Sequence, residues 1–153
     1  MELLVGRSPS DELEGFLEGE WAAWHAAQGH DPTVDWSGSS IAIVARDADG
    51  TIVGAAKGGM SAGIGHLREL MTAAHRRGEG VGSELVRQFE ERCWSSGCHK
   101  LTVHTEHGGP AHRFYQARDW DEEAIFRRDR SGRDFVRLCK FIEDQRPVEQ
   151  ERH

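Results

Sequence analysis

The sequence predicts an α/β fold, a layered sandwich on a mixed sheet whose strands are mostly antiparallel. Stretches with apolar residues at helical spacing alternate along the 153 residues with short apolar or alternating runs typical of strands. The expected order is one helix, three strands, a helix, a strand, a short helix and two strands, with glycine-containing turns between several of them. An order of this kind places helices against a sheet around one core.

The length predicts a single domain over residues 1–145 and a charged tail over residues 146–153. The hydrophobic fraction is 37 %, no run approaches the ~18 apolar residues of a membrane span, and residues 1–5 do not form a signal peptide. The three cysteines suit a reducing compartment better than a disulfide framework. We therefore expect a cytoplasmic protein without a membrane partner, and a homodimer stays open.

The formal charge of −7 argues against nucleic acid as a partner, because phosphate binding needs a basic face. It is compatible with a cationic substrate, although many solvated surfaces are equally acidic. In the loop over residues 28–40, Asp31, Asp35 and Trp36 are candidates for contact with such a substrate. An ordinary surface loop explains the same residues.

The first predicted helix begins with Ser8 as its cap, Pro9 at the first helical position and Asp11 in the first turn. Gly29 is expected to end it. An apolar stripe at helical spacing runs along it and comprises Leu13, Phe16, Leu17, Trp21 and Trp24.

The remaining elements follow from periodicity and turn residues. Asp47-Ala48-Asp49-Gly50 is a hairpin turn, and Gly58, Gly59 and Gly63 are expected to loosen the chain before the third strand. Helices are expected at 80–95 and 110–117, and strands at 41–45, 51–56, 66–72, 100–104, 124–128 and 135–142.

The stretch 66–93 has the most informative pattern: a strand, a turn rich in arginine and glycine, and an amphipathic helix. The first N–H groups of a helix have no partner within it, and glycines let a ligand approach the backbone, so this turn is a ready anion site. Arg76 and Arg77 add positive charge, and phosphate is the anion expected. An unliganded turn is the alternative. The spacing fits neither a P-loop, since Gly82 is followed by Ser83 and Glu84, nor a dinucleotide fingerprint.

Arg77-Gly78-Glu79-Gly80-Val81-Gly82 resembles the R/Q-x-x-G-x-G/A motif of the GNAT superfamily of N-acetyltransferases. An acidic residue, Glu69, lies eight positions before Arg77, and Ala111-His112-Arg113-Phe114-Tyr115 resembles the family's A-x-x-F-Y. The resemblance covers roughly residues 41–142.

This resemblance implies a sheet whose two central strands, 66–72 and 100–105, splay apart at a bulge, with acetyl-CoA as cosubstrate in the gap. The pyrophosphate would lie on the turn, and the pantetheine arm would pair with the strand before it. The implied binding residues are Leu70, Met71, Thr72, Arg77, Gly78, Glu79, Gly80, Val81, Gly82 and Ser83.

Two residues are candidates for the chemistry of acetyl transfer to an amine. A lysine-like amine of pKa ~10.4 must lose a proton before it attacks, and Glu69 is the expected base; an ion pair with Arg68 or another cation is the alternative. Tyr115, the only tyrosine, is expected to assist the leaving thiolate, with plain packing as its alternative. Backbone N–H groups of Leu70 to Thr72 would stabilise the oxyanion.

Two positions depart from the family's pattern. Gly108 stands where many relatives have Asn, which removes one expected hydrogen bond to the cosubstrate. Asp119-Trp120 replaces Gly-Phe, so Trp120 has to fill the aromatic place and Asp119 has to make a turn that suits glycine. Glu79 lies within the phosphate turn, where only the backbone is needed and the side chain can point outward.

No metal site is expected. His104 and His107 would point to opposite faces of a strand, and His99 and His112 are not at zinc-binding spacing. Direct transfer also needs no nucleophilic Cys93 or Cys98. The predicted function is therefore acetyl-CoA-dependent N-acetylation of a primary amine of a small molecule or peptide, the small molecule being favoured. A non-catalytic CoA-binding sensor or assembly module and a nucleotide-phosphate binder are the alternatives.

Overall fold

The computed structural model describes residues 1–6 and 8–142, so the expected tail at 146–153 lies outside the described residues. The chain divides into two compact units, Met1–Val34 and a second unit from Asp35 onward. Each unit is described by itself, and the single domain over 1–145 stays a prediction.

The first unit contains one helix, α1 (Asp11–Ala27). Its cap is Ser10, whose hydroxyl accepts a hydrogen bond from the Leu13 N–H at 3.2 Å. The prediction that Ser8 caps the helix was wrong, because Pro9 precedes the cap instead of opening the first turn. Gly29 follows the helix with a φ of +71°.

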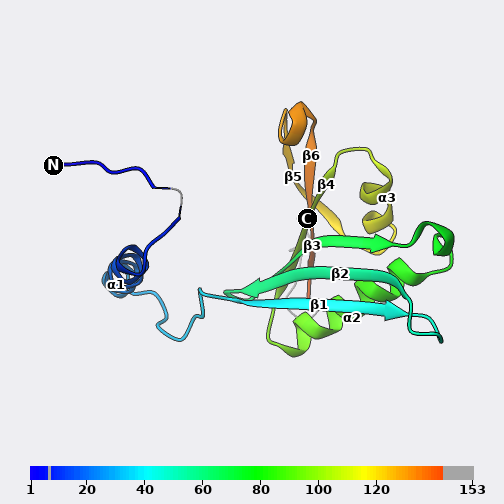
Figure 1. Ribbon diagram of the computed structural model, residues 1–153, viewed down its shortest axis with the longest axis horizontal. Helices are drawn as coiled ribbons and strands as arrows, with labels where there is room; N and C mark the ends of the chain where they lie inside the picture. Colours follow the sequence, from blue (N-terminus) through cyan, green and yellow to red (C-terminus); the bar gives the residue numbers. More distant parts are fainter. Residues whose placement is uncertain (7, 143–153) are drawn as a thin grey trace, which may run out of the picture. The chain divides into compact units, whose positions relative to one another are not determined.

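The second unit is built on a six-stranded sheet in the order β1-β2-β3-β4-β6-β5 (Figure 1). All neighbouring strands are antiparallel except β3 and β4, which are parallel. This confirms the expected mixed, mostly antiparallel sheet. The strands are β1 (Ser39–Arg46), β2 (Ile52–Ser61), β3 (Ile64–Thr72), β4 (Lys100–Glu106), β5 (Asp121–Phe126) and β6 (Phe135–Phe141).

Strand β2 continues through Gly58 and Gly59, where the sequence suggested a loosened segment. A Cβ at Gly58 would lie 2.2 Å from the backbone oxygen of His66, so this glycine permits close pairing with β3. The turn comes later, at Ala62 and Gly63, which both have positive φ. Strand β5 begins at Asp121 rather than at 124, because an irregularity after Glu122 obscures its alternation.

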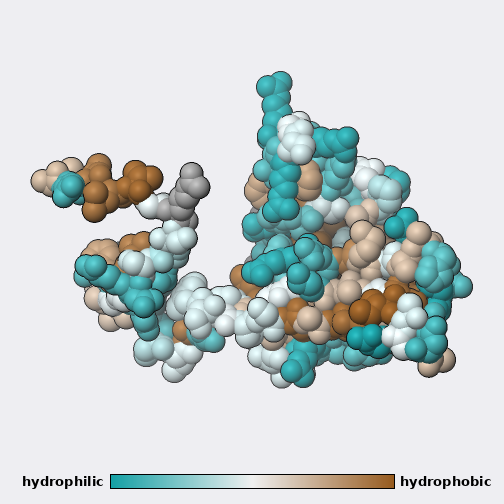
Figure 2. All heavy atoms as spheres, in the orientation of Figure 1, coloured by the Kyte–Doolittle hydropathy of each residue, from teal (hydrophilic) through white to brown (hydrophobic). Residues whose placement is uncertain are grey.

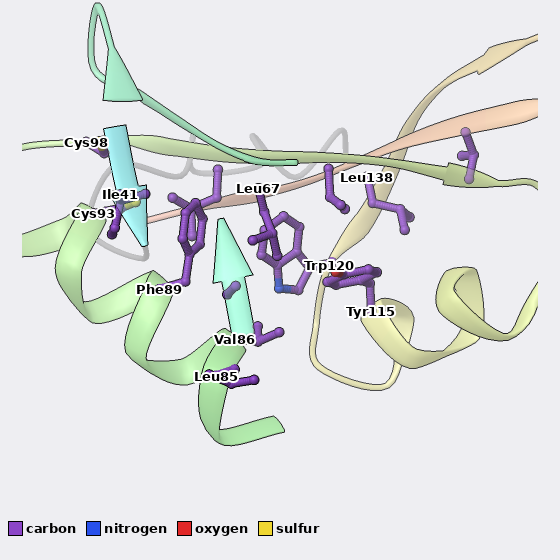
Figure 3. Close-up of a cluster of buried hydrophobic side chains, with 14 residues drawn as sticks. Ile41, Leu67, Leu85, Val86, Phe89, Cys93, Cys98, Tyr115, Trp120 and Leu138 are labelled. Atoms are coloured by element: carbon purple, nitrogen blue, oxygen red, sulfur yellow. The ribbon is translucent and has the colours of Figure 1, made fainter. Parts of the chain in front are cut away.

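Helices α2 (Val81–Ser95) and α3 (Pro110–Gln116) pack on the sheet, α2 mainly over β1 to β3 and α3 over β4 and β6. Figure 3 shows the buried side chains between these helices and the strands, among them Phe89, Trp120 and Leu138. The three cysteines are free and buried. Burial raises the pKa of the Cys93 thiol to about 12, so it is not a thiolate at neutral pH.

The central strands separate as the resemblance implied. Pairing of β3 with β4 ends at Leu67 and Val103, although β3 continues to Thr72 and β4 to Glu106. At the same point Arg68 is an extra residue in the β2–β3 register, since Gly58 pairs with Leu67 and Lys57 with Glu69. Such a bulge bends the strand and shifts its alternation by one residue.

Between Met1 and Ile142, Arg7 excepted, the structure contains no helix that is long and apolar enough to cross a membrane.

Candidate active site

An open groove with a volume of about 1030 Å³ occupies the gap between β3 and β4. Its walls are the second half of β3, the turn over residues 76–83, the start of α2, the end of β4 and one side of α3. Most of the residues expected from the sequence line it: Glu69, Leu70, Met71, Thr72, Arg77, Gly78, Gly80, Val81, Gly82, Ser83 and Tyr115. Glu79 is not among the lining residues.

The turn before α2 leaves backbone N–H groups free for a ligand. Gly78 and Gly80 have φ of +78° and +86°, and no atom lies within 4 Å of the Cβ that either would carry. Within α2 the first N–H to find a helical partner is that of Glu84, which donates to the Gly80 oxygen at 3.1 Å. Within the described part of the chain, the N–H groups of residues 78–83 therefore remain available at the positive end of the helix dipole.

Three arginines bring positive charge to this turn: Arg76 and Arg77, which the sequence suggested, and Arg118, which it did not. Arg76 lines the groove and forms ion pairs with both Asp47 and Glu79, which offset its charge; its contribution to anion binding stays a prediction. These pairs also explain why Glu79 points away from the groove. Arg77 stays beside it, with Nε 3.4 Å from the Thr72 oxygen.

Arg118 is the site residue that sequence reasoning missed. Its Nε donates to the Ser83 hydroxyl at 3.1 Å, and its guanidinium lies 3.5 Å from the centre of the Phe114 ring. Arg118, which lies two residues after the end of α3, thus places a positive charge at the start of α2. Arg118 and Ser83 are distant in the sequence and meet only because the end of α3 lies beside the start of α2 in the fold. No local sequence pattern predicts this contact.

The backbone of β3 presents alternate N–H groups to the gap. The Ala73 N–H donates to the Val53 oxygen at 2.8 Å, which assigns Ala73, Met71 and Glu69 to the side that pairs with β2. Leu70 and Thr72 therefore direct their N–H groups toward the separated β4. Among the described strands, neither of these two donors at the floor of the groove has a partner.

Glu69 lies on the floor of the groove, one residue after the bulge. Its carboxylate is 3.3 Å from Lys57 Nζ on β2. Lys57 is therefore the cation of the ion pair that was the alternative role for Glu69. The two side chains are 68 % and 65 % exposed, and an ion pair so exposed contributes little to stability. The carboxylate is therefore accessible to a substrate.

Tyr115 lines the groove from α3 although only 4 % of its surface is exposed. Its ring packs between Phe114 and Trp120, with centroids 5.1 and 5.3 Å away. Burial raises the pKa of its phenol well above the ordinary value, an effect that nearby Arg118 partly opposes. The phenol therefore keeps its proton throughout the neutral range and is available as a proton donor.

The sequence model of the acetyltransferase (GNAT) family matches residues 10–120. The chain belongs to the GNAT acetyltransferase family. A comparison with curated protein sequences gave no significant match.

Solved GNAT-type structures share the fold at low sequence identity. An acetyltransferase from Bacillus cereus ATCC 14579 superimposes with a TM-score of 0.71 at 16 % identity, covering 91 % of this chain and 98 % of that one. Nourseothricin acetyltransferase superimposes with a TM-score of 0.62 at 19 % identity, covering 67 % of this chain and 65 % of that one. The ribosomal-protein-S18-alanine N-acetyltransferase of Escherichia coli superimposes with a TM-score of 0.62 at 14 % identity, covering 74 % of each chain. At these identities the likeness shows the fold.

The two departures from the GNAT pattern are accommodated locally. Gly108 has a φ of +75°; its N–H donates to His112 Nδ1 at 2.9 Å, and its oxygen accepts from Arg113 Nη1 at 2.7 Å. Asp119 adopts a φ of +64°, which Asp tolerates better than most residues. Trp120 is 2 % exposed and donates from Nε1 to Glu90 at 2.9 Å, so it fills the aromatic place as expected.

One group of metal-ligand side chains occurs among the described residues: donor atoms of His107, His112 and Glu122 lie within 4.8 Å of one another. The buried ring of His112 is already engaged at both nitrogens, since Nδ1 accepts from Gly108 and Nε2 lies 2.6 Å from Glu122. Accepting at Nδ1 fixes the proton on Nε2, so no lone pair faces the other two ligands. The hydrogen bonds favour a structural role that holds the turn into α3.

The loop acids considered for a cationic substrate are engaged in turns. Asp31 accepts from the Thr33 N–H and hydroxyl, and Asp35 accepts from the Ser37 N–H and hydroxyl. These hydrogen bonds lower the pKa of both carboxyl groups. Trp36 lines a second, smaller hollow on the sheet.

Proposed function

We propose that this GNAT protein catalyses acetyl-CoA-dependent N-acetylation of a primary amine on a small molecule, by direct transfer. The observation that carries the proposal is the composition of one groove: a turn with free N–H groups, two strand N–H donors, an accessible carboxylate and a protonated phenol line the same gap. Each of these groups has a role in acetyl transfer to an amine.

The residues present fit the cosubstrate. N–H groups of residues 78–83, with Arg77 and Arg118, would hold the pyrophosphate of acetyl-CoA. Leu70, Met71 and Thr72 would line the pantetheine arm. Because the ion pairs of Arg76 offset its charge, we assign the charge contribution of this turn mainly to Arg77 and Arg118.

Glu69 is proposed as the base. It accepts a proton from the ammonium form of the substrate, and the free amine nitrogen then forms a bond to the thioester carbonyl carbon and releases its second proton to solvent. One of the N–H groups of Leu70 and Thr72 stabilises the oxyanion, by about 3 kcal/mol if it behaves like other such donors, and the other pairs with the pantetheine arm. The oxyanion then re-forms the carbonyl, the C–S bond breaks and the sulfur leaves as a thiolate.

Tyr115 is proposed to donate its proton to that thiolate and to recover one from solvent. Because a thiol has a pKa near 8.5, the leaving group needs only modest help. Tyr115→Phe should lower kcat by about 10- to 100-fold, at the lower end of general-acid effects. CoA affinity and melting temperature should hardly change, since the ring remains. Wild-type turnover from about pH 6 to 9 would return Tyr115 to packing alone.

The function is tested by measuring thiol release from acetyl-CoA with a panel of primary amines and the mass of the acetylated product. The proposal expects amine-dependent release with matching product. Tight CoA binding without turnover across the panel would favour the non-catalytic sensor or assembly module. Failure to bind CoA while binding ATP would favour a nucleotide-phosphate binder.

A further inference from the structure

A polar cluster lies on the sheet face that points away from α2. His66 on β3 and Thr102 on β4 are joined by a 2.7 Å hydrogen bond between Nδ1 and Oγ1. Next to them His104 accepts a 2.9 Å hydrogen bond at Nε2 from Arg137 Nε on β6. The His66 and His104 rings lie 5.3 Å apart, edge to face. Three strands thus hold a half-buried guanidinium and two imidazoles in place.

The bulge at Arg68 brings a second guanidinium to the same face. A Cβ on Gly59 would lie 3.6 Å from Arg68 Nη2, so Arg68 extends over Gly59, whereas the neighbouring Gly58 faces Phe89 of α2. Arg68 lines both the main groove and a second hollow of about 480 Å³, which His66 also lines. His104 lines the main groove. The part of the cluster formed by His66, Arg68 and His104 is therefore continuous with the proposed reaction site, and Arg137 adjoins it through its hydrogen bond to His104.

The positive charges of this cluster are not neutralised within the described chain. Among residues 1–6 and 8–142, neither Arg68 nor Arg137 forms an ion pair with a carboxylate, in contrast to Arg76. Burial lowers the pKa of His66, and His104, Arg68, Arg137 and Arg130 lower it further. Two negative charges are also nearby. Asp129 raises the pKa of His104, which burial and the arginines lower, and Glu69 is the residue after Arg68.

We propose that the acceptor amine carries a carboxylate, and that Arg68 and Arg137 bind this carboxylate while Glu69 receives the amine. This inference rests on the proposed function and names its substrate class: a free amino acid or a similar amino-carboxylate. Adjacent residues Arg68 and Glu69 offer opposite charges side by side, which complements the two ends of a zwitterion.

The chemistry of the cluster selects an anion with planar oxygens. A guanidinium donates two parallel hydrogen bonds to a carboxylate, and Arg137 is pre-oriented by His104 and by the Phe126 ring, 5.7 Å away. Figure 2 shows that the tip of the β5–β6 hairpin, where Arg130 lies, is hydrophilic. A plain alkylamine would leave both guanidinium groups without an anionic partner among the described residues.

The test compares amines that differ only in the anionic group: β-alanine with its carboxamide, and a set of α-amino acids each with its carboxamide. Phosphoethanolamine serves as the phosphate arm. Two readouts are taken for each probe: kcat/KM for acetyl transfer, and binding in the presence of CoA from the side-chain NMR signals of Arg137, His66 and His104.

In the wild type we expect the preferred carboxylate to exceed its carboxamide in kcat/KM by about 10- to 100-fold, mainly through KM, as hydrogen bonds to a charged group usually contribute. Arg68→Gln and Arg137→Gln should each remove most of that preference and leave kcat nearly unchanged. Arg133→Gln is the matched control, because it deletes one positive charge from a residue paired at 3.0 Å with Glu106 on β4. It should keep the preference.

The two readouts separate this inference from the function on which it rests. Turnover with equal use of carboxylates and carboxamides, or with loss of preference in Arg133→Gln as well, would overturn the inference alone. Carboxylate-selective NMR shifts without any turnover would support it and overturn the proposed catalysis. Preference for phosphoethanolamine over every carboxylate would overturn the assignment of a carboxylate.

Discussion

Replacing Glu69 with Gln is expected to lower turnover by about 10² to 10⁴, the range typical of general bases. The substitution keeps the size of the side chain and removes the proton acceptor, so the amine has to lose its proton unaided. Turnover should therefore rise more steeply with pH than in the wild type. Affinity for CoA should hardly change, because the groove backbone and the turn would hold it. Steady-state kinetics across pH, with calorimetry for CoA, measure both.

Lys57→Gln is the matched control for this variant. It breaks the same 3.3 Å ion pair and leaves the Glu69 carboxylate in place. Since both side chains are largely exposed, neither variant should lower the melting temperature appreciably. If Lys57→Gln loses as much activity as Glu69→Gln, or if Glu69→Gln is fully active, the base is a water chain or another carboxylate.

Replacing Gly80 with Asp is expected to weaken CoA binding on the order of 100-fold. Gly80 has a φ of +86°, opens α2 and borders the groove, so a carboxylate there would face the bound pyrophosphate. Repulsion and loss of close approach act together at the site where free N–H groups meet the anion. Calorimetric titration with CoA gives the affinity directly.

Gly97→Asp controls for backbone strain. Gly97 follows α2 with a φ of +89° and, like Gly80, has no atom within 4 Å of the added Cβ. An L-residue in this conformation costs about 1–2 kcal/mol at either position. If both variants lose the same stability but only Gly80→Asp binds CoA more weakly, the loss of affinity is due to the anion site. Similar loss of affinity in both variants would assign it to the fold.

Local patterns predicted much of the candidate site. The glycine-rich turn and the helix that follows it were predicted from turn chemistry and helical spacing, which depend on neighbouring residues, and α2 begins at Val81. Glu69 and Tyr115, which line one groove, were indicated by the resemblance to the GNAT family and not by local spacing. Sequence reasoning failed where partners are distant in the chain. Asp47 pairs with Arg76, and Arg118 reaches Ser83, through contacts that only the tertiary fold creates.

The proposed class of acceptor also depends on contacts between residues that are distant in the chain, which the sequence did not predict. A formal charge of −7 suggested compatibility with a cationic substrate, but charge at a site depends on which residues lack partners. Arg68 faces away from α2 because of the bulge, and Arg137 meets His104 because β4 pairs with β6. Alternation of apolar residues indicates which strands exist and does not reveal either contact.

Amide hydrogen exchange with and without saturating CoA tests the central claim most directly. If the gap between β3 and β4 binds the cosubstrate, exchange should slow at Leu70, Thr72 and residues 78–83 and stay unchanged at residues 130–132. Protection confined to the second hollow around residues 36–40, or no protection of the turn at a CoA concentration that saturates binding, would contradict the account.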